Sequence, residues 1–154
     1  MKSKLLIISV VALTLVLSGC GNTNKNEVSL GDVADTYNAA QELNDDMDNP
    51  NKISSDESIE NLYTIMNYNG SESKEAMKTA ISQGVDDGKN QGELDEEIIL
   101  KQDLSTAYMV GYIFGCKAVT GDEDMCNDDM GEKYQVIMMK EIQKQFPSMT
   151  TEVQ

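Results

Sequence analysis

The chain has 154 residues, with 27 acidic against 12 basic side chains and a formal net charge of −15 at neutral pH. Such an acidic surface repels nucleic acid, which argues against DNA or RNA as a partner. Histidine, arginine and tryptophan are absent from the sequence. Their absence excludes a histidine base, a histidine-ligated metal and an arginine clamp on phosphate. We therefore expect a protein that is not an enzyme and holds no cofactor and no metal.

The N-terminal segment, residues 1–19, predicts a lipoprotein signal peptide. Its apolar run from Leu5 to Leu17 follows two lysines and is too short for a comfortable membrane span. Leu17-Ser18-Gly19-Cys20 resembles a lipobox, so we expect cleavage before Cys20 and attachment of lipid to its thiol. The alternative is a secreted protein with an unrelated cysteine. The expected location is the cell envelope, at the outer membrane if the cell has two, because Asp does not follow Cys20.

The rest of the chain predicts one domain between two polar segments. Residues 20–27 are polar and read as a flexible tether to the membrane. Residues 28–147 are long enough for one helical domain with its own core. Residues 148–154 form a polar tail.

Two helices are predicted before residue 70, because apolar residues recur every three or four positions. Ser29 would cap the first helix, whose buried stripe comprises Val33, Tyr37, Ala40, Leu43 and Met47. Ser54 and Glu57 form a capping-box pattern for the second helix. Its stripe comprises Ile59, Leu62, Tyr63 and Met66.

The next two helices are predicted near 71–90 and at about 94–119, and small residues follow each other in them at intervals of four. These residues are Ala76, Ala80, Gly84, Gly88 and Gly92, then Ala107, Gly111 and Gly115. Spacing by four places them on one helix face, where a second backbone could approach closely. The alternative is that the glycines of the third helix only weaken it, since each costs about 1 kcal/mol against alanine.

The last helix is predicted to start at Asn127, after a loop from Thr120 to Met125, and to end at Pro147. Its buried stripe would comprise Met130, Tyr134, Met138, Ile142 and Phe146, with Ile137 beside it. The fold class is therefore all-α, a compact bundle of about five helices.

Cys116 and Cys126 are the two thiols left once Cys20 is acylated. Outside the cytoplasm oxidation is expected, so we predict one intramolecular disulfide between them. A free reactive pair is the alternative, but the spacing is unlike a redox C-x-x-C motif.

Five acidic residues gather around the second of these cysteines. They are candidates for contact with a basic partner: Asp122, Glu123, Asp124, Asp128 and Asp129. Calcium binding is a weaker reading, because the order of acids fits no EF-hand frame. Helix capping and solubility are the remaining explanations.

The stretch from Tyr108 to Pro147 resembles the core of Tai-type immunity proteins of type VI secretion amidase effectors. The matched features are the segment Gly111-Tyr112-Ile113 with Gly115, a nearby cysteine, a glutamine in the last helix and a closing proline. The resemblance implies a helical envelope protein that binds and blocks a peptidoglycan amidase. The chain departs from the family because no proline follows Cys126 and because family members are commonly not lipidated.

Two functions from different classes remain open. The first is a membrane-anchored immunity or inhibitor protein that blocks another protein, such as a basic peptidoglycan-targeting effector, without catalysis. The alternative is a surface-exclusion lipoprotein that interferes with phage or conjugative entry, or a structural envelope lipoprotein. The neighbouring genes would discriminate between them.

Overall fold

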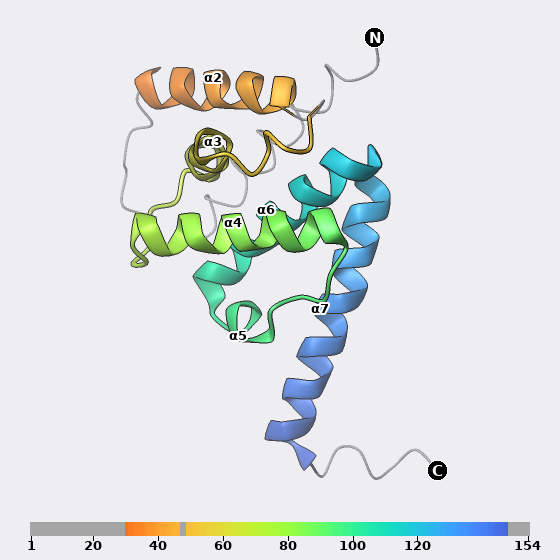
Figure 1. Ribbon diagram of the computed structural model, residues 1–154. Coiled ribbons are helices and arrows are strands. Elements are labelled where there is room, and N and C mark those ends of the chain that lie inside the picture. Colours follow the sequence, from red (N-terminus) through yellow and green to blue (C-terminus); the bar gives the residue numbers. More distant parts are fainter. Residues whose placement is uncertain (1–29, 47–48, 148–154) are drawn as a thin grey trace.

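The computed structural model describes residues 30–46 and 49–147, and within them all regular structure is helical. The elements are α2 (Leu30–Asp46), α3 (Asp56–Met66), α4 (Lys74–Asn90), α5 (Glu96–Ile99), α6 (Gln102–Thr120) and α7 (Glu123–Gln145). The predicted all-α fold is confirmed (Figure 1). No helix in the described part of the chain is long and apolar enough to cross a membrane.

Several predictions fall on residues outside the described part. They are the signal peptide at 1–19, Cys20 with the tether at 20–27, the cap Ser29, the stripe residue Met47 and the tail at 148–154.

Helices α2 and α3 pack on each other at one end of the molecule (Figure 1). Leu43 is buried between them, and two hydrogen bonds join them: Ser58 Oγ donates to Asp46 at 2.6 Å, and Asn61 Nδ2 donates to Glu42 at 2.9 Å. The predicted stripe of the first helix is half wrong, because Val33 and Tyr37 are 53% and 60% exposed. The first turns of α2 extend beyond the surface that α3 offers.

The predicted capping residue of α3 is wrong by one position. Ser55, not Ser54, is the N-cap and accepts from the backbone N–H of Ser58. Ser54 instead donates from its hydroxyl to Asp86 on α4 and accepts from Lys89, so it joins two helices.

The centre of the fold is the crossing of α4 and α6, the most extensive contact between any two of the described helices. Added Cβ atoms would lie 2.0 Å from the Tyr108 carbonyl oxygen at Gly84 and 2.0 Å from the Tyr112 oxygen at Gly88. Gly111 and Gly115 face the α4 backbone equally closely. Packing through small residues is therefore confirmed, and approach at this distance permits Cα–H···O contacts. Gly92 is an exception, because it lies beyond the end of α4 and has room for a Cβ.

The predicted helix at 94–119 is two helices. Asp95 caps the short α5 by accepting from the backbone N–H groups of Glu97 and Ile98. The chain then turns at Leu100 and Lys101 and starts again as α6. This turn buries Ile99 while it leaves Leu100 44% exposed.

Helix α7 runs along the side of the body, and its second half extends past the other helices (Figure 1). Cys126 and Ile137 are its buried residues. The predicted buried stripe is wrong at its end, since Ile142 is 43% and Phe146 is 50% exposed. The helix is longer than the body beside it, so its final turns lie against solvent.

Candidate binding surface

The start of α7 is fixed by the short connection from α6. Gly121, at φ 71°, ends α6 in the left-handed conformation that glycine adopts without strain. Asp122 is the N-cap of the next helix and accepts from the backbone N–H of Met125 at 2.9 Å. The predicted loop and the predicted cap at Asn127 are therefore wrong, because the cap of the last helix is Asp122, five residues earlier, and the helix begins at Glu123.

The predicted disulfide between Cys116 and Cys126 is confirmed. The two Cα atoms are 5.8 Å apart and both residues are fully buried. The bond joins the end of α6 to the first turn of α7. In the chain-entropy description, closing a loop of this length stabilises the fold by about 2–3 kcal/mol.

The five acidic candidates divide into two groups. Asp122 caps the helix, Glu123 forms an ion pair with Lys117, and Asp129 is engaged by α6 and by its own helix. The side chains at these three positions already make contacts within the domain. Asp124 and Asp128 are exposed and lie one turn apart on the outer side of α7.

Asp129 belongs to a hydrogen-bonded group that holds α7 against the body. The Tyr112 hydroxyl donates to its carboxylate at 2.6 Å. Lys133 Nζ donates to the same carboxylate at 2.8 Å and to the Gly92 carbonyl at 3.0 Å. A tyrosine of α6, two residues of α7 and the turn after α4 thus meet at one place.

The protonation states of this group follow from its partners. Burial alone would raise the pKa of Asp129, but Lys133 and the Tyr112 hydroxyl outweigh it and hold the pKa below its ordinary value. Burial, followed by the hydrogen bond to Asp129, raises the pKa of Tyr112. The group is therefore a carboxylate, an ammonium and a neutral phenol at neutral pH, which suits a structural contact rather than proton transfer.

A second tyrosine makes an equivalent contact one turn earlier on α6. The Tyr108 hydroxyl donates to Asp87 at 2.6 Å and accepts from the backbone N–H of Asp95 at 3.1 Å. Burial, then the hydrogen bond to Asp87, raises the pKa of Tyr108. Neither tyrosine was predicted from the sequence to make such a hydrogen bond. The spacing of four between them, beside the glycines of α6, was the available signal.

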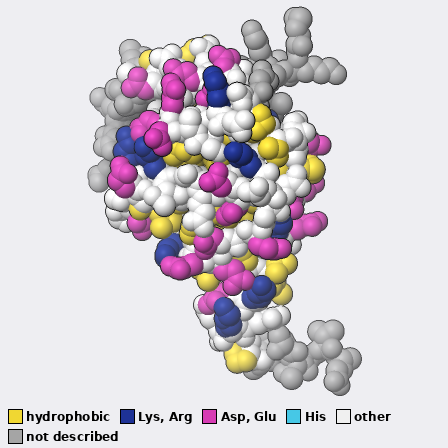
Figure 2. All heavy atoms as spheres, viewed as in Figure 1, with side chains coloured by type: hydrophobic (Ala, Val, Ile, Leu, Met, Phe, Trp, Pro, Cys, Tyr) yellow, Lys and Arg dark blue, Asp and Glu magenta, His cyan; other side chains and the backbone are white. Residues whose placement is uncertain are grey.

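Helix α7 exposes more large apolar side chains than any other described helix, on the side turned away from Cys126 and Ile137, which is its outward face. The exposed acids Asp124 and Asp128 lie near its start. The exposed apolar residues are Met125, Val136, Met139, Ile142 and Phe146, at 40%, 55%, 55%, 43% and 50% exposure. Yellow and dark blue side chains gather at the lower end of the molecule in Figure 2, where Figure 1 places the end of α7.

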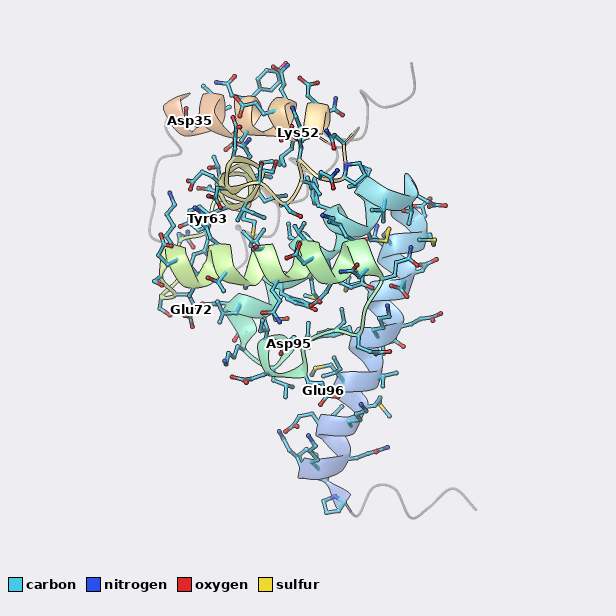
Figure 3. All side chains as sticks on the ribbon, viewed as in Figure 1. Asp35, Lys52, Tyr63, Glu72, Asp95 and Glu96 are labelled. Carbon is cyan, nitrogen blue, oxygen red and sulfur yellow. A yellow bond between two sulfur atoms is a disulfide. The ribbon has the colours of Figure 1, made fainter. Side chains whose placement is uncertain are left out.

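A shallow hollow lies along this face. It is lined by Glu132, Gln135, Val136, Met139, Lys140 and Gln143. Lys140 is held on one side of it by Glu96, at 2.8 Å, and Figure 3 shows Glu96 beside the helix. Three lining residues spaced by four along α7 therefore differ in character: Glu132 is acidic, Val136 is apolar and Lys140 is basic.

The side chains on this surface are of the kinds that bind another molecule without reacting with it. Exposed carboxylates attract cationic groups, and exposed methionine, valine and phenylalanine side chains bury area against an apolar partner. Within residues 30–46 and 49–147, no group of three or more Cys, Asp and Glu side chains is placed to hold a metal ion.

Comparisons with protein-family models, with curated proteins and with solved structures found no match to this chain. The resemblance to Tai-type immunity proteins therefore stays a hypothesis.

Proposed function

We propose that this protein is an envelope-anchored lipoprotein that binds and blocks another protein without catalysis, as immunity proteins do. The anchor follows from the lipobox at Leu17-Ser18-Gly19-Cys20. The observation that carries the binding function is the outward face of α7, which none of the other described helices covers. Surfaces with several exposed apolar side chains beside charged ones are typical of protein contacts.

The partner would present basic groups toward the start of α7. Asp124 and Asp128 are exposed there, whereas Asp122, Glu123 and Asp129 are used within the domain. An acidic binding surface also speeds association with a cationic partner, and salt weakens this effect. A basic effector directed at peptidoglycan is a partner of this kind.

The test replaces Asp124 and Asp128 with asparagine together. A photo-crosslinking residue at position 128 first captures the partner in intact cells, and the purified partner is then titrated with each variant. Two rim charges contribute about 1–2 kcal/mol together, so affinity should fall about five- to thirtyfold at low salt and less at high salt. The partner's own activity should return in parallel.

The matched control replaces Asp35 and Asp45, two exposed aspartates of α2, with asparagine. This control removes the same charge from a different helix, away from the start of α7. Equal affinities for the two double variants would show that the total charge, and not the start of α7, attracts the partner.

A further inference from the structure

Helix α2 is the outermost helix at its edge of the molecule, and it packs mainly on α3 (Figure 1). Its inner side is marked by the buried residues Ala39, Ala40 and Leu43. Glu42 and Asp46 lie toward the same side, because each accepts a hydrogen bond from α3. The opposite side of α2 therefore faces away from the body.

This opposite side carries no charge. Successive residues of a helix are about 100° apart around its axis, so residues 33, 34, 37 and 41 fall within an arc of about 100°. They are Val33, Ala34, Tyr37 and Gln41, and all four are exposed. The five acids in the sequence of α2 all fall outside this arc, and the nearest of them, Asp45, lies about three turns beyond Val33. We call these four residues the outer arc of α2.

The composition of the outer arc suits the interface between lipid and water. Tyr37 is 60% exposed, and its apolar ring with a polar hydroxyl is typical of residues at the level of lipid headgroups. Its hydroxyl accepts from Gln41 Nε2 at 2.8 Å, and Val33, 53% exposed, lies one turn before it. Because the chain carries a net charge of −15, an uncharged arc is a part of its surface that anionic headgroups do not repel.

The predicted lipid on Cys20 limits how far α2 can lie from the membrane. Leu30, where α2 begins, follows Cys20 by ten residues, which span at most about 36 Å when fully extended. Val33 and Tyr37 lie in the first turns of α2, so among the described residues they are the large exposed apolar side chains nearest to the anchor along the chain. A contact too weak to hold a free protein on a membrane can form here, because the anchor keeps the two surfaces close together.

We propose that the outer arc of α2 rests on the headgroup region of the membrane that holds the lipid anchor. This inference rests on the anchor of the proposed function and uses no residue of α7. It adds an orientation, because Figure 1 shows α2 along one edge of the molecule and the end of α7 at the opposite edge. With α2 on the membrane, the apolar end of α7 lies away from lipid, where a partner protein can reach it.

The first experiment uses the absence of tryptophan from the chain. Tyr37→Trp places a single fluorophore in the outer arc. Phe146→Trp is the matched control, since Phe146 is an aromatic residue 50% exposed at the end of α7. Each full-length lipidated protein is reconstituted into phosphatidylcholine vesicles with or without bromine on the acyl chains near the headgroups. Bromine should lower the fluorescence of the Tyr37→Trp variant about twofold and that of the Phe146→Trp variant by less than about a tenth.

The second experiment adds a charge to the outer arc in the Tyr37→Trp background. Val33→Glu places a carboxylate against the headgroups, so quenching should be lost. Val136→Glu is the matched control, because it makes the same change at a valine of α7 that is 55% exposed, and it should leave quenching unchanged. Both valines are exposed, so neither variant should unfold, and circular dichroism checks this. Replacing part of the phosphatidylcholine with phosphatidylglycerol should weaken quenching, because anionic headgroups repel the acids that flank the arc.

Two results would overturn the membrane contact while leaving the anchor in place. They are equal quenching of the Tyr37→Trp and Phe146→Trp variants, and equal effects of Val33→Glu and Val136→Glu. A second copy or another protein seated on α2 in place of lipid gives the first result. Absence of fatty acid from Cys20 would instead overturn the anchor of the proposed function and this contact together, so the two failures are distinguishable.

Discussion

Replacing Gly88 with alanine tests whether the backbone approach of α4 and α6 holds the fold together. The new Cβ would lie 2.0 Å from the Tyr112 carbonyl oxygen, whereas ordinary contact begins at 3.4 Å. The neighbouring atom belongs to the backbone, so no side chain can move aside. The two helices must therefore separate locally, by about 1 Å.

The magnitude follows from what lines the crossing. Ile81, Val85, Tyr108 and Tyr112 are fully buried there, and a gap of 0.5–1 Å forfeits about a quarter to a half of a contact's dispersion energy. Overpacking of this kind costs about 3 kcal/mol. The better helix propensity of alanine offsets about 1 kcal/mol of it. We expect the free energy of unfolding to fall by about 2 kcal/mol, which is a roughly thirtyfold shift toward the unfolded state.

The assay is urea unfolding followed by circular dichroism at neutral pH, under non-reducing conditions that keep the disulfide intact. The matched control is Gly131→Ala, because Gly131 lies inside α7 with no atom within 4 Å of its added Cβ. That variant should gain up to about 1 kcal/mol from helix propensity alone. If Gly88→Ala unfolds at the same urea concentration as Gly131→Ala, the close crossing is not what stabilises this fold.

Three further predictions concern the disulfide, the carboxylate of Asp129 and the anchor. Free-thiol counting should find none at Cys116 and Cys126, and reduction should cost about 2–3 kcal/mol of unfolding free energy; two titratable thiols would contradict this. Asp129 has its pKa held below the ordinary value in the folded protein, so its contribution to stability is present above the ordinary pKa and is lost as pH falls through the folded pKa; Asp129→Asn should flatten the acid limb of stability against pH, and an unchanged limb would show that other carboxylates dominate. Cys20→Ser should abolish labelling of the protein by a radioactive fatty acid, and retained label would remove the basis for the anchor.

The crossing of α4 and α6 was predictable because it depends on residue size alone. Glycine and alanine at intervals of four mark a face with almost no side chains, and Gly84, Gly88, Gly111 and Gly115 all lie on it. The disulfide was predictable for a similar reason, since the two cysteines that follow the predicted lipid-bearing Cys20 allow one pairing. Neither prediction needed the positions of other elements.

Helix ends were less predictable because several residues near each end are able to cap. Asn127 and Asp122 are both good N-cap residues, and the chain starts α7 at the earlier one. The choice depends on Gly121, which ends α6 and lets the next helix begin at once. The break between α5 and α6 depends likewise on Asp95, whose side chain accepts hydrogen bonds from two backbone N–H groups. Local propensity alone does not rank such competing sites.

The uncovered end of α7 could not be predicted, because a helical apolar stripe looks the same whether it faces a core or a partner. Ile137 is 6% exposed and Ile142 is 43% exposed, yet both were predicted for the buried side of the helix. Which of them is buried depends on how far the body extends beside the helix, and that length is set by α4, α5 and α6. Selection against aggregation disfavours apolar residues that face water without use. The apolar residues beyond Ile137 are therefore better explained by a surface that is covered in the working protein.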